Sequence, residues 1–476
     1  MPQSASPKET DVTHQPTEAA CRYCGSITKA NDKYCWHCWV ELVNTITDLE
    51  QASRLRASLA RGRLVRRVIR LGLLVSGLAA IALYSVSETV NQPVPLPSGD
   101  ANVVVAADAW GVLGRDIAQT GWVRDGSAIR GGPLWEFQTQ AQLLTSPVIA
   151  DGVVYQGTGD GRIVALDADD GKLIWSRDTT GPLATSPAVT ADTIYIGFRD
   201  GQLWALRRED GEPRWIRRTS ANISTSPTVL DGVVYVGFGD GTIRAIDAQN
   251  GVELWSYDTG IWVTGAPAIH ENILAVATQD GDLHLIDVKT GLKRLHYGVL
   301  HLTKDAPTFA GDKLIFASER GQLTVLDSTK LEYVLEKRIR VFRMELFMLG
   351  IEGNAPVKKG FVWGAQFPGD VALSAPAATE DRVYVNTQTG RLFSLDLATG
   401  EVLWEYDAGA PSNTSPVVVG DFVYMGTQAG DIHVVNRHGG IAETTFHVGG
   451  PLRGQIVVAG NRLFVISQDG TLYAFD

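Results

Sequence analysis

Four cysteines near the N-terminus have a spacing that specifies a chemical site. They form two Cys-x2-Cys pairs separated by ten residues. Two such pairs can bring four thiolates into a tetrahedron around zinc, with Zn–S bonds of about 2.3 Å, and Gly25 permits the turn after the first pair. The predicted ligands are Cys21, Cys24, Cys35 and Cys38. Because four sulfur ligands leave no position for water or substrate, we expect a structural zinc ion rather than a catalytic one.

Two disulfide bonds are the alternative use of these cysteines, and a reducing cytoplasm disfavours them. Residues 21–40 resemble the short zinc ribbons at the N-termini of many bacterial membrane proteins, although Trp39 stands where such ribbons usually carry glycine. His37 is interpreted as a surface residue rather than a fifth ligand. The resemblance implies a protein or nucleic-acid partner, or a module that only folds, and the residues do not choose among these.

An arginine cluster followed by an uncharged apolar run predicts a membrane anchor. Residues 51–87 carry seven arginines and no acid, whereas residues 88–476 carry a net charge of −15. We predict a transmembrane helix over residues 68–87, close to the shortest length that crosses a hydrocarbon core of about 30 Å. A buried core helix is the alternative, but the basic flank on one side and Glu88 on the other favour insertion. Positive residues stay inside, so the N-terminus should be cytoplasmic and residues 88–476 extracytoplasmic.

The segments around this helix are interpreted from their composition. Residues 1–20 are predicted to be a disordered tail, 41–67 a basic juxtamembrane helix and 88–105 a linker. The arginines of the juxtamembrane helix attract anionic lipid, or they act only as a topology signal. The acidic C-terminal part repels phosphate backbones, so we expect no nucleic acid to bind there.

The C-terminal part of the chain is a series of repeats. Eight units follow one another, six of the seven intervals between them are 40 residues long, and one is 69. Asp-Gly and Asn-Gly turns divide the unit 226–259 into four short runs rich in Val, Ile, Tyr and Trp. A repeat of this length with four strands is typical of a propeller blade, so we predict an all-β, eight-bladed β-propeller over residues 106–476.

The ends of the repeat region predict how the ring closes. The last unit stops at Asp476, and its missing half occurs at the start of the region, where Gly131–Trp135 matches Gly171–Trp175. The N-terminal strand should therefore become the outermost strand of the last blade, which removes the exposed edge.

The spaced pattern Ala-x-Asp-x3-Gly-x3-Trp resembles the tryptophan-docking motif of PQQ-type repeat propellers, the quinoprotein alcohol dehydrogenase-like superfamily. Trp110, Gly114, Arg115, Asp116, Thr120 and Gly121 are similar to the lead-in of that family. The resemblance implies that tryptophans dock one blade on the next, at Trp135, Trp175, Trp215, Trp255 and Trp404. We interpret Leu295, Leu335 and Thr444 as replacements of this tryptophan in three blades.

The same resemblance implies two functions. Some members are calcium- and PQQ-dependent dehydrogenases, and others are propellers without a cofactor, such as the outer-membrane assembly lipoprotein. The dehydrogenases usually carry a vicinal cysteine pair beside the quinone, and this repeat region has no cysteine. The recurrent aspartates, such as Asp160, Asp200 and Asp240, precede glycine in turns, which explains them without Ca²⁺. PQQ and calcium are therefore not expected.

Two surfaces could hold a partner. The excess residues, roughly 338–370, are assigned to a loop between the fifth and sixth blades that emerges at the pore entrance and acts as a docking surface or lid, or else packs locally. Its candidate residues are Arg343, Phe361, Trp363 and Phe367. The second surface is formed by one aligned position of the repeat, which is occupied by Lys304, Asn413 and Arg453 in three of the units. These residues could line the pore mouth and hold an anionic ligand, or form a solvated rim.

Together these patterns predict a single-pass membrane protein with a cytoplasmic structural zinc ribbon and an extracytoplasmic, non-enzymatic propeller. The propeller would be a binding or assembly scaffold for protein, peptide or polysaccharide. The alternative is a PQQ- and calcium-dependent quinoprotein dehydrogenase.

Overall fold

The computed structural model describes two compact units, Met1–Asn91 and Gln92–Asp476. In the second unit it describes residues 102–103, 109–139, 145–181, 183, 185–298, 305–318, 321–332, 336–351, 353–367, 370 and 374–476. In the first unit it describes three short strands, β1 (Glu18–Cys21), β2 (Ile27–Lys29) and β3 (Thr45–Ile46), in the order β2-β1-β3.

These strands change two predicted boundaries in the first unit. β1 includes the last residues of the predicted disordered tail, because Glu18 to Ala20 pair with Ile27 to Lys29. β3 lies within the range predicted to be a juxtamembrane helix, since Thr45 and Ile46 pair with β1. Cys21 ends β1, whereas Cys24, Cys35 and Cys38 lie outside the described residues, so the zinc site stays a prediction.

The membrane anchor also stays a prediction. Residues 68–87 lie outside the described residues. Among the helices that the structure does describe, none combines the length and the apolar character needed to cross a bilayer.

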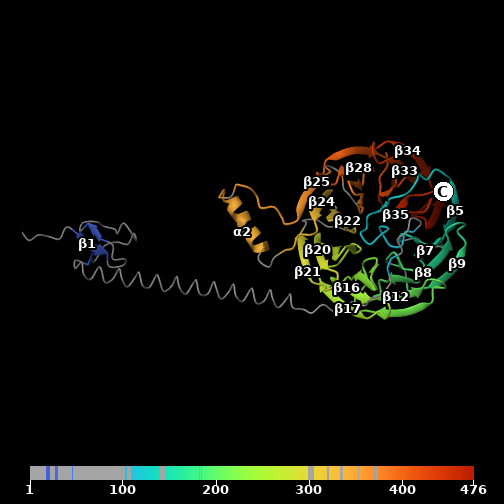
Figure 1. The fold of residues 1–476 in the computed structure, drawn as a ribbon, viewed down its shortest axis with the longest axis horizontal. Helices are drawn as coiled ribbons and strands as arrows, with labels where there is room; N and C mark the ends of the chain where they lie inside the picture. Colours follow the sequence, from blue (N-terminus) through green and yellow to red (C-terminus); the bar gives the residue numbers. More distant parts are fainter. Residues whose placement is uncertain are drawn as a thin grey trace, which may run out of the picture. The chain divides into compact units, whose positions relative to one another are not determined.

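The second unit is a ring of eight antiparallel sheets, as predicted (Figure 1). The first blade contains β6 (Val148–Ala150), β7 (Val153–Thr158), β8 (Arg162–Asp167) and β9 (Leu173–Asp178). The second contains β10 (Ala188–Val189), β11 (Thr193–Gly197), β12 (Gln202–Arg207) and β13 (Pro213–Arg218). The third contains β14 (Thr228–Leu230), β15 (Val233–Gly237), β16 (Thr242–Asp247) and β17 (Glu253–Asp258). The fourth contains β18 (Ala268–His270), β19 (Ile273–Ala277), β20 (Asp282–Asp287) and β21 (Lys293–Gly298).

The other four blades continue the ring. The fifth contains β22 (Thr308–Ala310), β23 (Lys313–Ala317), β24 (Gln322–Asp327) and, after the helix α2 (Glu336–Met348), β25 (Phe361–Gln366). The sixth contains β26 (Ala377–Ala378), β27 (Arg382–Asn386), β28 (Arg391–Asp396) and β29 (Val402–Asp407). The seventh contains β31 (Val417–Val419), β32 (Phe422–Gly426), β33 (Asp431–Asn436), β34 (Ala442–His447) and the added strand β4 (Trp122–Val123). The eighth contains β35 (Leu452–Ala459), β36 (Arg462–Ser467), β37 (Thr471–Phe475) and β5 (Pro133–Gln138), with β30 (Thr414–Ser415) beside β35.

The burial of each strand follows its place in the blade. The second and third strands are apolar on both faces because each blade packs between two others, and β11 and β15 are buried along their whole length. The outermost strands alternate instead, since one side of β9 or β29 faces solvent. Glycines with positive φ, such as Gly241 at 86°, make the tight turns between strands.

A tryptophan in the outer strand of six blades contacts the following blade in the same way. Each indole N–H donates to a backbone carbonyl of the next blade, at 2.7 to 3.1 Å: Trp135 to Ala168, Trp175 to Arg208, Trp215 to Ala248, Trp255 to Val288, Trp363 to Leu397, and Trp404 to Arg437. Each ring also covers a glycine with positive φ, as Trp175 covers Gly211.

This arrangement corrects one assignment in the fifth blade. The repeat spacing predicts that Leu335 replaces the docking tryptophan there, but Trp363 fills the position and pairs with Val325 across the strands. Leu335 lies outside the described residues. The insertion lies before the outer strand β25, so the docking position comes later in the sequence than the 40-residue spacing predicts. Leu295 and Thr444 do occupy the tryptophan position in their blades.

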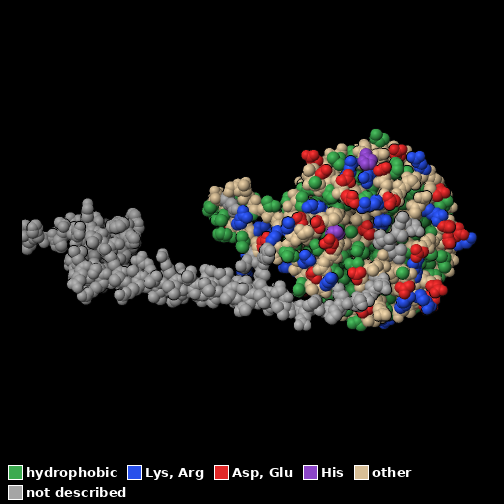
Figure 2. Space-filling model, in the orientation of Figure 1, with side chains coloured by type: hydrophobic (Ala, Val, Ile, Leu, Met, Phe, Trp, Pro, Cys, Tyr) green, Lys and Arg blue, Asp and Glu red, His purple; other side chains and the backbone are tan. Residues whose placement is uncertain are grey.

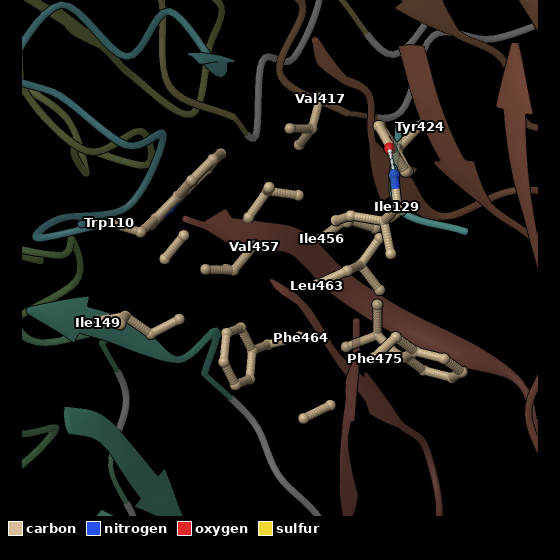
Figure 3. Packing of buried hydrophobic residues seen from close by; sticks show 14 of the residues in the cluster. Trp110, Ile129, Ile149, Val417, Tyr424, Ile456, Val457, Leu463, Phe464 and Phe475 are labelled. Atoms are coloured by element: carbon tan, nitrogen blue, oxygen red, sulfur yellow. Dashed lines mark hydrogen bonds between the residues drawn. The ribbon is translucent and has the colours of Figure 1, made fainter. Parts of the chain in front are cut away.

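The ring closes through its N-terminal strand, as predicted. β5 pairs antiparallel with β37, which places Trp135 opposite Ala474 in the register that Trp175 and Ala165 adopt in the first blade. Around the closure, side chains of the first, seventh and eighth blades form one apolar cluster, in which Trp110 and Phe475 are buried (Figure 3). There the Tyr424 hydroxyl accepts a hydrogen bond from the backbone N–H of Ile129 at 2.9 Å.

The propeller begins before residue 106. Val103, predicted to lie in a linker, is buried and forms a bridge with Thr190 of the second blade. The side-chain oxygen of Asn102 accepts a hydrogen bond from the backbone N–H of Asp231 at 2.7 Å. Burial of Val103 in the core explains why these residues join the ring rather than the linker.

Candidate functional site

Residues 109–123 close the central channel of the ring. This segment, called the plug, runs past the inner strands and accepts backbone hydrogen bonds from equivalent positions of six blades, the first, the second and the fourth to the seventh. Carbonyls of Trp110, Gly111, Ile117, Ala118, Thr120 and Gly121 accept from Ile149, Val189, Ile269, Phe309, Ala378 and Val418. The lead-in residues that the sequence singled out therefore satisfy the edges of the inner strands and leave the channel closed at the plug.

The plug is held in a compact, strained conformation. Asp116 accepts two hydrogen bonds from Thr120, from its N–H at 3.0 Å and its hydroxyl at 2.5 Å. Burial raises the pKa of Asp116, although those hydrogen bonds and the Arg115 charge oppose the shift. Arg115 and Gln119 have φ angles of 79° and 59°, a region that non-glycine residues rarely adopt. The side-chain oxygen of Gln455 accepts a hydrogen bond from Gly114 and ties this loop to the eighth blade.

Above the plug lies a cavity of about 250 Å³, called the cup. Its floor contains Leu113, Gly114, Gln119 and Gly121, and its wall is formed by residues that precede or begin the inner strands. The described wall is mostly hydroxyls and amides: Thr145, Ser146, Ser186, Ser226, Ser374, Asn413, Ser415 and Gln455, with Asp305 as the carboxylate.

A chain of serines fixes part of this wall. Ser186 accepts a hydrogen bond from the N–H of Ser146, and Ser226 accepts one from the N–H of Ser186, each at 3.0 Å. Ser146 in turn accepts from the N–H of Gln455 at 3.1 Å. Each hydroxyl therefore links one blade to its neighbour. Each of these three serines directly precedes a proline in the sequence, so this repeated Ser-Pro pair has a structural role at the channel mouth.

The column predicted to line the pore mouth is placed only in part. Asn413 is exposed and lines the cup. Arg453 is exposed and is absent from the described lining, whereas its neighbour Gly454 belongs to it. Lys304 lies outside the described residues.

The inserted residues are not where they were predicted. They connect β24 to β25 within the fifth blade, rather than the fifth blade to the sixth, and this connection, residues 328–360, is called the arm. In a four-stranded antiparallel sheet, the loop after the third strand lies at the end opposite to the one where the chain enters the inner strand. The arm therefore leaves the ring at the face opposite the cup and cannot be a lid over it.

The arm carries the helix α2 at the periphery of the ring (Figure 1). Its side chains expose an apolar surface. Phe342 and Met348 of α2 are 59% and 78% exposed. Nearly half of the exposed large apolar side chains in the described residues belong to the arm: Leu331, Ile339, Val341, Phe342, Met344, Met348, Leu349, Ile351 and Val357. Figure 2 shows apolar and basic side chains together on this projection.

Both ends of the arm are attached to β21 of the fourth blade. The N–H of Glu332 donates to the carbonyl of Arg294 at 2.8 Å. Lys358 donates to the Gly298 carbonyl and lies over the Tyr297 ring, 4.7 Å from its centroid. Burial lowers the pKa of Lys358. An ion pair of 2.8 Å between Lys359 and Glu336 joins the end of the arm to the start of α2.

Two of the four residues predicted on this docking surface are core residues instead. Trp363 is 8% exposed because it docks on the sixth blade, and Phe367 is 5% exposed because it packs against Phe393, with ring centroids 4.7 Å apart. Phe361, at the start of β25, is 38% exposed, and Arg343 is exposed on α2.

Fold and site define an eight-bladed propeller built from tryptophan-docked repeats, with a channel closed by its own lead-in. The family described as outer membrane protein assembly factor BamB matches residues 123–222, 182–306 and 357–476, well over half of the chain. The chain belongs to this family of PQQ-repeat propellers. No curated protein matches the sequence.

Solved structures share the fold at low sequence identity. BamB from Moraxella catarrhalis superposes with a TM-score of 0.59 at 20% identity, covering 74% of this chain and 98% of that one. Quinohemoprotein alcohol dehydrogenase from Comamonas testosteroni gives a TM-score of 0.61 at 16% identity, covering 78% and 81%. A europium-containing methanol dehydrogenase gives 0.60 at 13% identity, covering 78% and 98%. The likeness thus extends both to BamB and to dehydrogenases, and it establishes the fold alone.

The described residues of the cup do not fit the quinone PQQ. This cofactor carries three carboxylates, which need cationic partners, yet the ionisable group in the described lining is the acidic Asp305. A Ca²⁺ ion takes six to eight oxygen ligands, usually including several carboxylates, and Asp305 is the carboxylate that this lining offers. The donor set is that of a polar, nearly uncharged cavity.

Proposed function

We propose that this protein is a non-enzymatic binding scaffold, anchored in the membrane by residues 68–87, whose extracytoplasmic propeller holds a partner protein through the arm. The observation that carries the proposal is the exposed apolar surface of the arm. A soluble surface rarely leaves so many large apolar side chains together in water, because covering them is favourable by about 25 cal/mol per Å².

The chemistry of the arm favours a protein over a polysaccharide. Aliphatic side chains such as Met348, Leu349 and Ile351 offer sugar hydroxyls no hydrogen bond, but they fit an apolar groove on a protein. Arg338 and Arg343 are exposed on the same helix, α2, which makes this part of the arm basic as well as apolar and favours a partner with acidic groups at the rim of its interface. The arm is an insertion in an otherwise regular repeat, which is a common position for a function added to a scaffold.

The other parts of the proposal come from the sequence. Cys21, Cys24, Cys35 and Cys38 would hold a structural Zn²⁺ on the cytoplasmic side, and the arginines of residues 51–70 would contact anionic lipid. The described lining of the cup offers hydroxyls, amides and the Asp305 carboxylate, which suit hydrogen bonding to a polar ligand.

Site-specific photo-cross-linking in cells that produce the full chain tests the role of the arm. A photoreactive amino acid replaces Phe342, and a matched control replaces Ile174, which is 50% exposed on β9 of the first blade. We expect a protein adduct from position 342 that is absent at position 174 and is lost when Met348 and Leu349 are changed to serine. Adducts with lipid alone, or equal adducts at both positions, would refute the proposal.

A second experiment separates the scaffold from the enzyme. The purified full chain is incubated with PQQ and Ca²⁺, and quinone binding and dye reduction with alcohols are measured. The scaffold predicts neither stoichiometric binding nor turnover. Tight binding of one quinone with dye reduction would establish the dehydrogenase instead.

A further inference from the structure

Three side chains of metal-ligating types meet on one face of the fourth blade, outside the cup. Asp282 and His284 lie two residues apart on β20 and therefore on the same face of the strand. His296 of β21 is the direct cross-strand partner of His284. One ring nitrogen of each histidine and one oxygen of Asp282 lie within 4.8 Å of one another.

We propose that Asp282, His284 and His296 bind a divalent transition-metal ion, for which Zn²⁺ is the best match. Two imidazoles and one carboxylate are a donor set that Zn²⁺ prefers, with bonds of about 2.0–2.2 Å. Such bonds place tetrahedral ligand atoms about 3.3 Å apart. Nε2 of His296 and Oδ2 of Asp282 are 2.6 Å apart, so a small outward movement makes room for the ion.

The surroundings orient the ligands. The hydroxyl of Tyr257, from β17 of the third blade, lies 3.1 Å from Nδ1 of His284. A hydrogen bond to the nitrogen that does not bind the metal commonly fixes a ligand imidazole. Asp282 and His296 are half-buried, so the ion has access from solvent, whereas His284 is buried. Asp280 adds negative charge nearby, and Lys293 and Lys358 add positive charge.

The seventh blade supplies an internal comparison. Asp431 and His433 have the same spacing as Asp282 and His284, and the Tyr406 hydroxyl lies 2.9 Å from Nδ1 of His433. Thr445 stands opposite His433, where the fourth blade has His296. His447 is bonded to Asp431 at 2.8 Å, yet in the described residues three ligand atoms come together only in the fourth blade. His296 is therefore what distinguishes a metal site from a pair of buried interblade contacts.

The test measures zinc bound per chain after equilibrium dialysis of the purified full-length protein. His296→Thr gives the fourth blade the threonine of the seventh, and Asp282→Asn is a second variant in case the first misfolds. His447→Thr is the matched control, because it removes an Asp–His contact in the seventh blade, where the described residues bring no three ligand atoms within 4.8 Å of one another. We expect the control to bind as much zinc as the natural sequence and the two ligand variants to bind one ion fewer. Equal zinc in all four proteins, or a loss in the control as well, would overturn the proposal.

Cobalt spectra separate this site from the predicted cysteine site. Co²⁺ bound by thiolates gives an intense near-ultraviolet charge-transfer band, and Co²⁺ bound by imidazole and carboxylate does not. The difference spectrum between the natural sequence and His296→Thr should show visible d–d bands without that band. A thiolate band in the difference would place the lost ion at the cysteines and contradict the proposal.

Discussion

Substitution of Gly211 by alanine tests whether tryptophan docking holds the blades together. A Cβ at Gly211 would lie 2.7 Å from Cζ3 and 2.8 Å from Cε3 of Trp175, closer than carbon atoms approach. Gly211 also has a φ of 70°, which costs an alanine about 1–2 kcal/mol. Forcing the indole aside adds about 1–3 kcal/mol and disturbs its 3.1 Å hydrogen bond to the Arg208 carbonyl.

Gly152 is the matched control for the backbone term. Its φ is 71°, and an added Cβ would meet nothing within 4 Å. Gly152→Ala should therefore lower the free energy of unfolding by about 1–2 kcal/mol, and Gly211→Ala by about 2–5 kcal/mol. Urea titrations followed by circular dichroism measure both.

A double mutant then assigns the difference to the indole. In a background of Trp175→Leu, the extra cost of Gly211→Ala should disappear, which gives a coupling energy of about 1–3 kcal/mol. If the two single alanine variants agree within about 0.5 kcal/mol, the contact between Trp175 and the glycine contributes nothing and the docking argument is wrong.

Trp363→Ala should cost about 3–5 kcal/mol in urea titrations, whereas Phe361→Ala on the same strand should cost less than about 1 kcal/mol; equal losses would contradict the assignment of Trp363 to the core. Burial lowers the pKa of His433. Below a pH of about 6.5 this histidine therefore binds a proton in the unfolded chain but stays neutral in the folded chain. The free energy of unfolding is then highest above that pH and decreases below it. The thermal midpoint should thus fall less between pH 7.5 and 5 in His433→Gln, and an unchanged fall would refute this reasoning. Residues 92–476 with a glycine-serine segment of equal length in place of residues 133–138 lack β5 and should aggregate in size-exclusion chromatography through the exposed edge of β37. The unaltered residues 92–476 retain both β5 and the plug and should stay monomeric; identical elution would argue against closure as the cause.

Local signals in the sequence were enough to specify the ring. Asp-Gly and Asn-Gly turns and runs of β-branched residues depend on neighbours along the chain, so strand number and blade number could be counted from the repeat. The match between Gly131–Trp135 and Gly171–Trp175 also identified the closing strand, because both ends of the last blade keep the local pattern of a complete one.

The candidate sites depended on contacts that the repeat does not record. The repeat spacing points to Leu335, whereas Trp363 docks the fifth blade on the sixth. The spacing misleads because an insertion before the outer strand lengthens the repeat by as much as an insertion after that strand. Phe367 is an aromatic residue of the kind found on docking surfaces, but only its contact with Phe393 shows that it is buried. The residues of the proposed metal site are visible in the sequence as Asp-x-His in one strand and a histidine in the next. Only the pairing of the two strands shows that His284 and His296 lie opposite each other.

The sequence by itself therefore determined an eight-bladed ring closed by its N-terminal strand, because turns and alternation are encoded residue by residue. The tertiary structure decided that Trp110 to Val123 plug the channel, that the arm leaves the ring on the face opposite the cup, and that His296 faces His284. Each of these features depends on which strand edges and faces meet across the ring. The number of residues between two positions in the sequence does not show whether they meet, because the packing of the blades decides it.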